Sequence, residues 1–163
     1  MKICKIKKVE TPSRGTEQSA GIDFYIPRFT ESFLRDFQDK NVGAVNLDGE
    51  SIRVLPGELL NIPSGIIVEM PKDCVLIAFN KSGISSKFGL SVLACVVDSD
   101  YQGEVHLSIV NTSNHIVDIY SGQKLVQFIL FKLPYCPIIE VEIKDIHINE
   151  TKRGKNGFGS TGI

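Results

Sequence analysis

Short runs of β-branched and aromatic residues, separated by turns that contain glycine or proline, restrict the fold of this chain most strongly. Val, Ile and Phe favour extended strands, whereas Gly, Pro, Asn and Ser favour turns. The runs cover most of the chain, which predicts an all-β fold, either a jelly-roll-like β barrel or a two-sheet jelly roll. The predicted strands lie at 2–9 (an edge strand), 22–27, 51–71 (two runs separated by Pro-Gly and Pro-Ser-Gly turns), 74–79, 90–98, 104–111, 115–122, 124–133 and 136–143.

One segment departs from the strand pattern. In residues 30–40, Phe33, Leu34 and Phe37 recur at helical spacing, and Thr30 is of a type that caps helices. We therefore predict a short helix within an excursion from the sheet over residues 28–50, which would be either a partner surface or decoration. No internal repeat or interdomain linker is visible, so residues 1–163 are predicted to form a single domain.

Composition excludes several classes of function. The chain has 163 residues and a net charge of −1, so it can bury a core and carries no nucleic-acid or membrane footprint. No apolar run approaches the roughly 20 residues of a membrane helix, and the N-terminus lacks the apolar core of a secretory signal. We therefore expect a cytoplasmic protein with buried free thiols and no disulfides. The cysteines in question are Cys4, Cys74, Cys95 and Cys136.

The segment 80–90, NKSGISSKFGL, places a cation, a hydroxyl and a flexible backbone N–H side by side at Lys81, Ser82 and Gly83. These groups suit phosphate oxygens, and residues 85–90 would extend the loop into a short helix. The alternative is a surface loop with a capping serine.

The segment 92–111 is predicted to form a hairpin around the turn DSDYQG. Asp98 ends an apolar run, where a partly desolvated carboxylate would suit a general base acting on water; the alternative is a cap of the strand end. Asp100 is interpreted as a turn former. Tyr101 would either present its ring to a ligand or cover the hairpin.

Two further features have polar groups that need partners. Gln127 interrupts an apolar run, and its amide should be hydrogen-bonded in the core or to a ligand. The glycine-rich tail would be disordered alone or ordered around a ligand, because glycines allow close approach, Arg153 can pair with phosphate and Phe158 can stack on a base. Its other candidate ligand contacts are Gly159, Ser160 and Thr161.

Taken together and in this order, five segments resemble the motifs of the trimeric dUTPases. They read SAGIDFYIP (19–27), NKSGISS (80–86), VVDSDYQGEVHLSIVN (96–111), GQKLVQFIL (122–130) and RGKNGFGSTG (153–162). The resemblance implies a jelly-roll-like β barrel, a homotrimer with shared active sites, and hydrolysis of dUTP to dUMP and pyrophosphate. That reaction would keep uracil out of DNA and supply dUMP for thymidylate synthesis.

The resemblance also implies roles for individual residues. Asp98 would activate the attacking water, Tyr101 would pack under the deoxyribose and exclude a 2′-hydroxyl, and Gln127 would contribute a hydrogen bond near the phosphates. The residues implied around the base are Val92, Val96, Val97 and His106. Lys81, Ser82 and Gly83 would hold the phosphates. The arm 151–163 would be mobile and close over the nucleotide through Arg153, Phe158, Gly159, Ser160 and Thr161.

Magnesium is the implied cofactor. The sequence shows no dedicated carboxylate cage, so we expect Mg²⁺ to be held by the triphosphate and water. Asp23 would either support the metal site indirectly or have a structural role beside the turn at Gly21.

The chain departs from the family pattern at three motif positions. Lys81 replaces the usual arginine, Cys95 replaces a usual glycine, and Val92 replaces a common asparagine, so that only its backbone would contact the base.

Two other functions remain open: a dCTP deaminase of the same fold with Glu104 as proton shuttle, and a nucleotide-gated interaction protein that uses residues 28–50.

Overall fold

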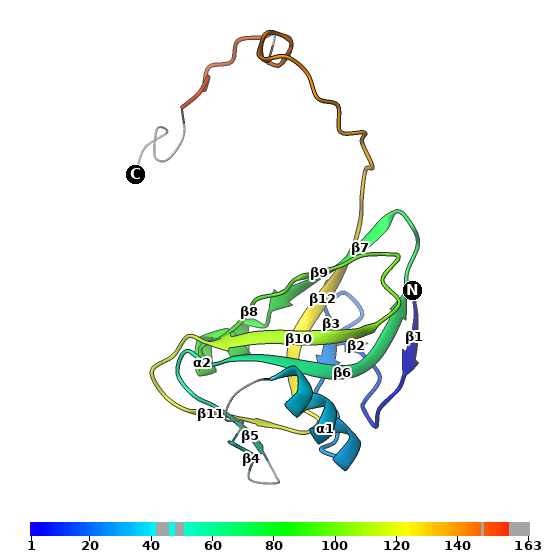
Figure 1. Ribbon diagram of the computed structural model, residues 1–163, viewed down its shortest axis with the longest axis vertical. Coiled ribbons are helices and arrows are strands. Elements are labelled where there is room, and N and C mark those ends of the chain that lie inside the picture. Colours follow the sequence, from blue (N-terminus) through cyan, green and yellow to red (C-terminus); the bar gives the residue numbers. More distant parts are fainter. Residues whose placement is uncertain (42–45, 48–50, 148, 157–163) are drawn as a thin grey trace.

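The computed structural model describes residues 1–41, 46–47, 51–147 and 149–156, and within them the strands pair into three antiparallel sheets (Figure 1). The four-stranded sheet has the order β1 (Lys2–Lys5), β6 (Leu59–Glu69), β10 (Glu104–Asn111), β8 (Leu90–Val92). The five-stranded sheet has the order β2 (Ser13–Arg14), β3 (Ile22–Tyr25), β12 (Lys124–Lys132), β7 (Cys74–Asn80), β9 (Val96–Val97). The third sheet has the order β11 (Val117–Tyr120), β5 (Ser51–Val54), β4 (Asn46–Leu47).

The described helices are α1 (Glu31–Lys40), α2 (Ser82–Phe88) and the 3-10 turn η1 (Ile143–Asp145). Strands therefore dominate, as the sequence predicts. The apolar side chains of all three sheets and of α1 join in one core. At its centre, Phe24 of β3 and Phe128 of β12 pack with ring centroids 4.5 Å apart.

Helix α1 confirms the predicted helix at 30–40 and packs on β6. Thr30 caps it, because its Oγ1 accepts a hydrogen bond from the backbone N–H of Phe33 at 3.3 Å. Phe33 and Phe37 are both 0% exposed. At the end of the helix, the Asn41 side chain forms two hydrogen bonds with the backbone of Asn61 in β6. Asn61 N–H donates to Asn41 Oδ1 at 2.7 Å, and Asn41 Nδ2 donates to Asn61 O at 3.1 Å.

The Pro-Ser-Gly sequence at 63–65 does not form the predicted turn, because β6 continues through it. The register between β6 and β10 shifts between Glu104 and His106, where His106 lies opposite Pro63. Gly65 has φ +73°, a conformation that favours glycine. Residues 63–65 therefore form a β-bulge within β6, although their sequence is typical of a turn.

The predicted strand 90–98 is two strands in different sheets. β8 pairs with β10, whereas β9 pairs with β7. The predicted hairpin is thus formed only in part, because β9 does not pair with β10. The two ends of the crossing are fixed by backbone hydrogen bonds from Leu93 N to Ser108 O at 3.0 Å and from Ala78 N to Cys95 O at 2.7 Å.

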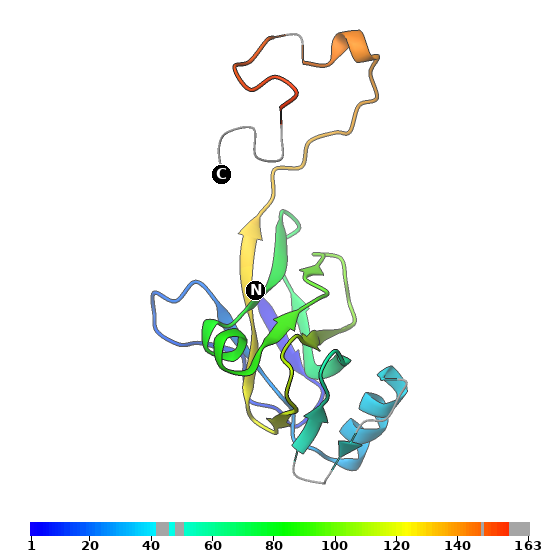
Figure 2. The same cartoon turned by 90° about the vertical axis from the view of Figure 1, so that its left-hand side faces the viewer.

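The predicted strand at 136–143 is wrong. This segment follows β12, leaves the sheets and extends away from them in both views (Figures 1 and 2). Ile138 is fully exposed and Ile139 is 72% exposed. A strand needs a neighbour for its backbone groups, and this segment pairs with no described strand of the same chain.

The cysteines are free thiols, as predicted, but they are not all buried. Cys74 is buried and Cys95 half-buried, whereas Cys4 and Cys136 are exposed because they lie in the edge strand β1 and in the extended segment after β12. Across the described part of the chain, every helix is too short or too polar to cross a bilayer.

Replacing Phe33 by alanine tests whether α1 is part of the core. Phe33 stacks between Phe29 and Phe37 at centroid distances of 5.4 and 5.9 Å, so Phe33→Ala should lower the free energy of unfolding by about 3–5 kcal/mol. Chemical denaturation measures this. The control is Phe88→Ala on α2, which is 38% exposed and should cost much less. Equal losses for both variants would contradict a core role for α1.

Candidate active site

A cavity of about 240 Å³ lies where the chain crosses between the two larger sheets. It brings together five of the predicted site residues: Val96, Val97, Asp98, Tyr101 and His106. Its other lining residues are Asn61, Ala94, Glu104, Val105 and Phe128. The lining thus combines apolar side chains with a few polar ones, which is the usual make-up of a small-molecule site.

Asp98 follows β9 directly and lies at the edge of this cavity, exposed to solvent. Its backbone oxygen accepts from Tyr101 N at 3.2 Å, which closes the turn. Within the described residues its carboxylate forms no hydrogen bond or ion pair, so it is available to a water molecule. A free carboxylate beside a cavity has the position that a general base requires.

Tyr101 folds back over the hairpin. Its hydroxyl donates to the backbone oxygen of Glu104 at 2.9 Å. The ring lies over Gly103 so closely that a side chain there would place its Cβ 2.6 Å from the ring Cζ. Glycine at 103 is therefore required for this ring position, and Tyr101 also lines the cavity.

His106 also lines this cavity, and its Nε2 is buried. Within the described residues its Nε2 has no hydrogen-bond partner. Burial lowers the pKa of His106 below its ordinary value of 6.5, although the charge of Glu104 opposes that shift. The imidazole is consequently neutral at pH 7 and retains hydrogen-bonding capacity for a ligand.

A second group of predicted residues gathers around Asp23 of β3. Both of its carboxylate oxygens form ion pairs, one with Lys81 and the other with Lys124 at 3.1 Å. Asp23 is buried, so it fixes the direction of the Lys81 side chain. The pairing supports the structural interpretation of Asp23, since two neighbouring ammonium groups disfavour a metal cation there.

Gln127 is half-buried, lies opposite Asp23 in the strand register, and has a hydrogen-bond partner for its amide. Its Nε2 donates to Asn80 O at 2.8 Å. A side chain at Gly21 would place its Cβ 2.9 Å from Gln127 Cδ, so the glycine of the first motif leaves room for this amide.

Other predicted residues lie apart from both groups. Helix α2 begins at Ser82 with Lys81 as N-cap, three residues before the predicted helix, and ends at Gly89. The backbone N–H of Val92 donates to Asn80 Oδ1 at 2.7 Å, and Val92 is not in the cavity wall. Arg153 is exposed, and its Nε donates to Asn156 O at 3.2 Å. Phe158, Gly159, Ser160 and Thr161 lie outside the described residues.

Sequence reasoning missed Asn61 and Phe128 in the cavity wall and Asn80 between the two groups. Asn61 is a polar residue within the apolar run of β6, which is the one available signal. Phe128 reads as an ordinary core residue of β12, so nothing local marks it.

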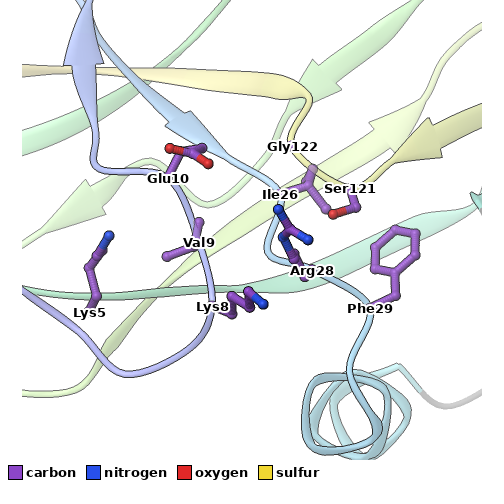
Figure 3. Close-up of a pocket in the computed structure, with 9 residues that line it drawn as sticks. All are labelled: Lys5, Lys8, Val9, Glu10, Ile26, Arg28, Phe29, Ser121 and Gly122. Atoms are coloured by element: carbon purple, nitrogen blue, oxygen red, sulfur yellow. The ribbon is translucent and has the colours of Figure 1, made fainter.

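A larger cavity, of about 630 Å³, lies elsewhere (Figure 3). It is lined by Lys5, Lys8, Val9, Glu10, Ile26, Arg28, Phe29, Ser121 and Gly122. None of these belongs to either predicted group, and its one carboxylate is outnumbered by cations. We therefore place the chemistry in the smaller cavity, where a free carboxylate is available. Among the described residues, no three His, Cys, Asp or Glu side chains are grouped to hold a metal ion.

Comparison with known proteins agrees with this geometry. The dUTPase family profile matches residues 49–162. A deoxyuridine 5'-triphosphate nucleotidohydrolase of Thermoanaerobacter sp. (strain X514) is 32% identical, over 99% of this chain and 98% of that protein. One from Fusobacterium nucleatum subsp. nucleatum is 31% identical, over 99% and 96%.

Solved structures give the same fold. A Staphylococcus bacteriophage 80alpha dUTPase with dUpNHpp has a TM-score of 0.77 and 19% identity, over 99% of this chain and 98% of that one. A mutant dUTPase from phage phi11 of S. aureus, described with a structural Mg(II) ion, has a TM-score of 0.68 and 18% identity, over 86% and 95%. The predicted jelly-roll-like fold and the predicted family are thereby confirmed: the chain belongs to the dUTPase family.

Proposed function

We propose that this chain hydrolyses dUTP to dUMP and pyrophosphate, with Asp98 activating water for attack on the α-phosphate. The observation that carries the proposal is the Asp98 carboxylate, unpaired among the described residues, at a cavity of about 240 Å³ in a chain of the dUTPase family. The deoxyuridine 5'-triphosphate nucleotidohydrolase activity of the relatives and the dUpNHpp of a structural neighbour support the substrate.

Recognition of uracil follows from two strand edges. Among the described strands, β9 is the last of its sheet and pairs only with β7, so its other edge has no partner there. β8 pairs with β10 only from Ile109 onward, which leaves the edge of β10 at residues 104–107 open as well. Uracil presents an N3–H between two carbonyls, and backbone groups at such edges match that pattern and mismatch cytosine. Val96, Val97 and His106 would surround the base.

Tyr101 would pack under the deoxyribose and leave no space for a 2′-hydroxyl. On the phosphate side, Lys81 would meet the triphosphate, with Ser82 and Gly83 supplying a hydroxyl and a backbone N–H, and Gln127 nearby. Asp23 is assigned the role of holding Lys81 in place through its ion pair.

The separation of the Asp98 cavity from the cluster around Asp23 supports an active site that is shared between copies of the chain. Asp23, Lys81 and Gln127 do not line the cavity assigned to the base, which supports a division of the proposed site into two parts. The exposed Ile138, Ile139 and Ile143 after β12 also require cover from outside the chain. We infer a homotrimer in which the arm 151–163 closes over a nucleotide with Arg153, Phe158, Gly159, Ser160 and Thr161.

Magnesium is assigned to the substrate and not to a protein cage. Asp23 is already paired with two lysines, and Asp98 is needed for water, so these carboxylates do not fit a direct metal site. When bound to the triphosphate, Mg²⁺ would neutralise its charge and restrict its conformation.

The deaminase alternative is disfavoured by the contacts of Glu104. Its Oε1 accepts from Gly65 N at 2.6 Å and its Oε2 from Lys7 Nζ at 2.7 Å, so this carboxylate is held by the protein and is not free to carry protons to a base. No contact of residues 28–41 favours the interaction-protein alternative, because the phenylalanines of α1 face the core.

Asp98→Asn should lower turnover of dUTP by about 10²–10⁴-fold, the range for loss of a general base, while binding of dUTP stays nearly unchanged. The assay measures dUMP and pyrophosphate with Mg²⁺ present, beside dCTP and dTTP. The matched control is Asp100→Asn in the same turn, which should keep most activity. Near-normal turnover in Asp98→Asn, or equal hydrolysis of the three nucleotides, would contradict the proposal.

Asp23→Asn should raise the KM for dUTP about tenfold, because Lys81 loses a charged hydrogen-bond partner worth about 1.5–3 kcal/mol. Competitive inhibition by deoxyuridine, which has no phosphate, should not change. The control is Asp73→Asn, whose carboxylate pairs with the exposed Lys132 at 3.1 Å. If weaker binding extends to deoxyuridine, Asp23 supports the whole fold and not the phosphate grip.

His106 gives a pH prediction. Its pKa is lower in the folded protein than in the unfolded chain. As the pH decreases below about 6.5, the unfolded chain therefore binds a proton more readily than the folded protein, and the free energy of unfolding decreases. Between about pH 7.5 and 5.5, the melting temperature of wild type should therefore drop more than that of His106→Gln. His115→Gln, on an exposed turn, should keep the wild-type slope. Parallel slopes for wild type and His106→Gln would show that His106 is not held neutral.

A further inference from the structure

We propose that Lys7 is a positioning residue for sugar selection: together with Glu104 and with Asp36 of α1, it fixes Tyr101 against the deoxyribose. The inference deepens the proposed function and rests on it for the role of Tyr101. It gives the helix in the 28–50 excursion a part in substrate selection.

The first step is the burial of Lys7, whose side chain is only 8% exposed. Its Nζ lies 2.7 Å from Glu104 Oε2 and 3.0 Å from Asp36 Oδ2. The partners differ in exposure, since the side chain of Glu104 is 15% exposed and that of Asp36 is 49% exposed. One ammonium group therefore ties the start of β10 to the middle of α1.

The second step is the other oxygen of Glu104. Its Oε1 accepts from the backbone N–H of Gly65 at 2.6 Å, in the bulge of β6. A side chain at Gly65 would place its Cβ 2.8 Å from Lys7 Cβ, so the lysine stem also fills the space beside the bulge. Bulges re-aim neighbouring side chains, and here Lys7 and Glu104 hold the bulge from both sides.

The third step leads from Glu104 to Tyr101. The backbone oxygen of Glu104 accepts the Tyr101 hydroxyl at 2.9 Å, while its side chain is held at both oxygens. The position of that backbone oxygen is thus set by the ion pair, and the tyrosine hydroxyl follows it. A ring held at its hydroxyl and seated on Gly103 has little freedom to move aside for a 2′-hydroxyl.

The charge of Lys7 persists in this buried place. Burial alone would lower the pKa of Lys7, but hydrogen bonds and charges from Glu104 and Asp36 outweigh it and raise the pKa above 10.5. Buried ion pairs contribute little net stability compared with apolar residues of similar volume. A conformational role for Lys7 explains the cluster better than a contribution to stability.

The strand β1 offers a matched comparison. Lys2 of β1 forms an ion pair with a glutamate too: its Nζ lies 2.9 Å from Glu69 Oε1 in β6. The two side chains are 79% and 71% exposed. An exposed pair has little effect on geometry because water screens it and both side chains stay mobile. Lys2→Met therefore removes a similar ion pair without touching Tyr101.

The experiment compares kcat/KM for dUTP with kcat/KM for UTP, in the full chain with Mg²⁺. Lys7→Met should reduce the preference for dUTP about tenfold or more, since small misplacements of a positioned group have effects of this size. Lys7→Arg, which keeps the charge, should recover part of the preference, and Lys2→Met should keep all of it. A purely structural lysine would lower both rates and the melting temperature but leave their ratio unchanged.

Two milder variants cover the case in which Lys7→Met does not fold. Asp36→Asn should reduce the preference for dUTP in the same direction but less, whereas Asp39→Asn on the same helix should not, because Asp39 forms none of the ion pairs found in the described residues. If wild type fails to hydrolyse dUTP, the proposed function is wrong. If it hydrolyses dUTP and both Lys7→Met and Asp36→Asn keep the wild-type preference, only this inference is overturned.

Discussion

The crossing of residues 93–95 from one sheet to the other is the constraint on which the rest of this structure depends. β8 is paired with β10 before the crossing and β9 with β7 after it, so the two strands that follow each other in sequence are pulled apart. The separation opens two strand edges onto a cavity and places Asp98 at its edge. A continuous hairpin would have closed those edges by hydrogen bonding, and a planar base would have had nothing to pair with.

Both halves of the proposed site rely on a buried carboxylate that holds a lysine. Asp23 directs Lys81 on the phosphate side, and Glu104 engages Lys7 on the sugar side. In each case the carboxylate lies in or next to a strand, so the rigid sheet sets the direction of a long, flexible side chain. Such an arrangement suits a phosphate grip and a sugar stop, which both require fixed geometry more than strong binding.

Local pattern predicted the features that depend on local physics. The spacing of Phe33 and Phe37 and the cap at Thr30 predicted α1, and the polar end of an apolar run placed Asp98 directly after a strand. Features that depend on the partner strand were not predictable: the bulge that absorbs residues 63–65, the division of 90–98 between two sheets, and the unpaired segment 136–143. Lys7 was missed for the same reason, since in an edge strand it reads as one more surface lysine until α1 and β10 cover it.

The failed strand at 136–143 and the divided site have a common explanation. A segment with strand-like alternation, exposed isoleucines and no partner among the described strands has the composition of a strand that pairs elsewhere. The residues clustered around Asp23 likewise do not line the cavity assigned to the base, and we propose that a second copy of the chain completes the site. The sequence pattern indicates a strand at 136–143 and site residues in both parts of the proposed site. Within the described part of one chain, that segment has no partner strand and the two parts of the site are not joined. In the homotrimer that we propose, the extended segment after β12 would therefore serve both association and catalysis.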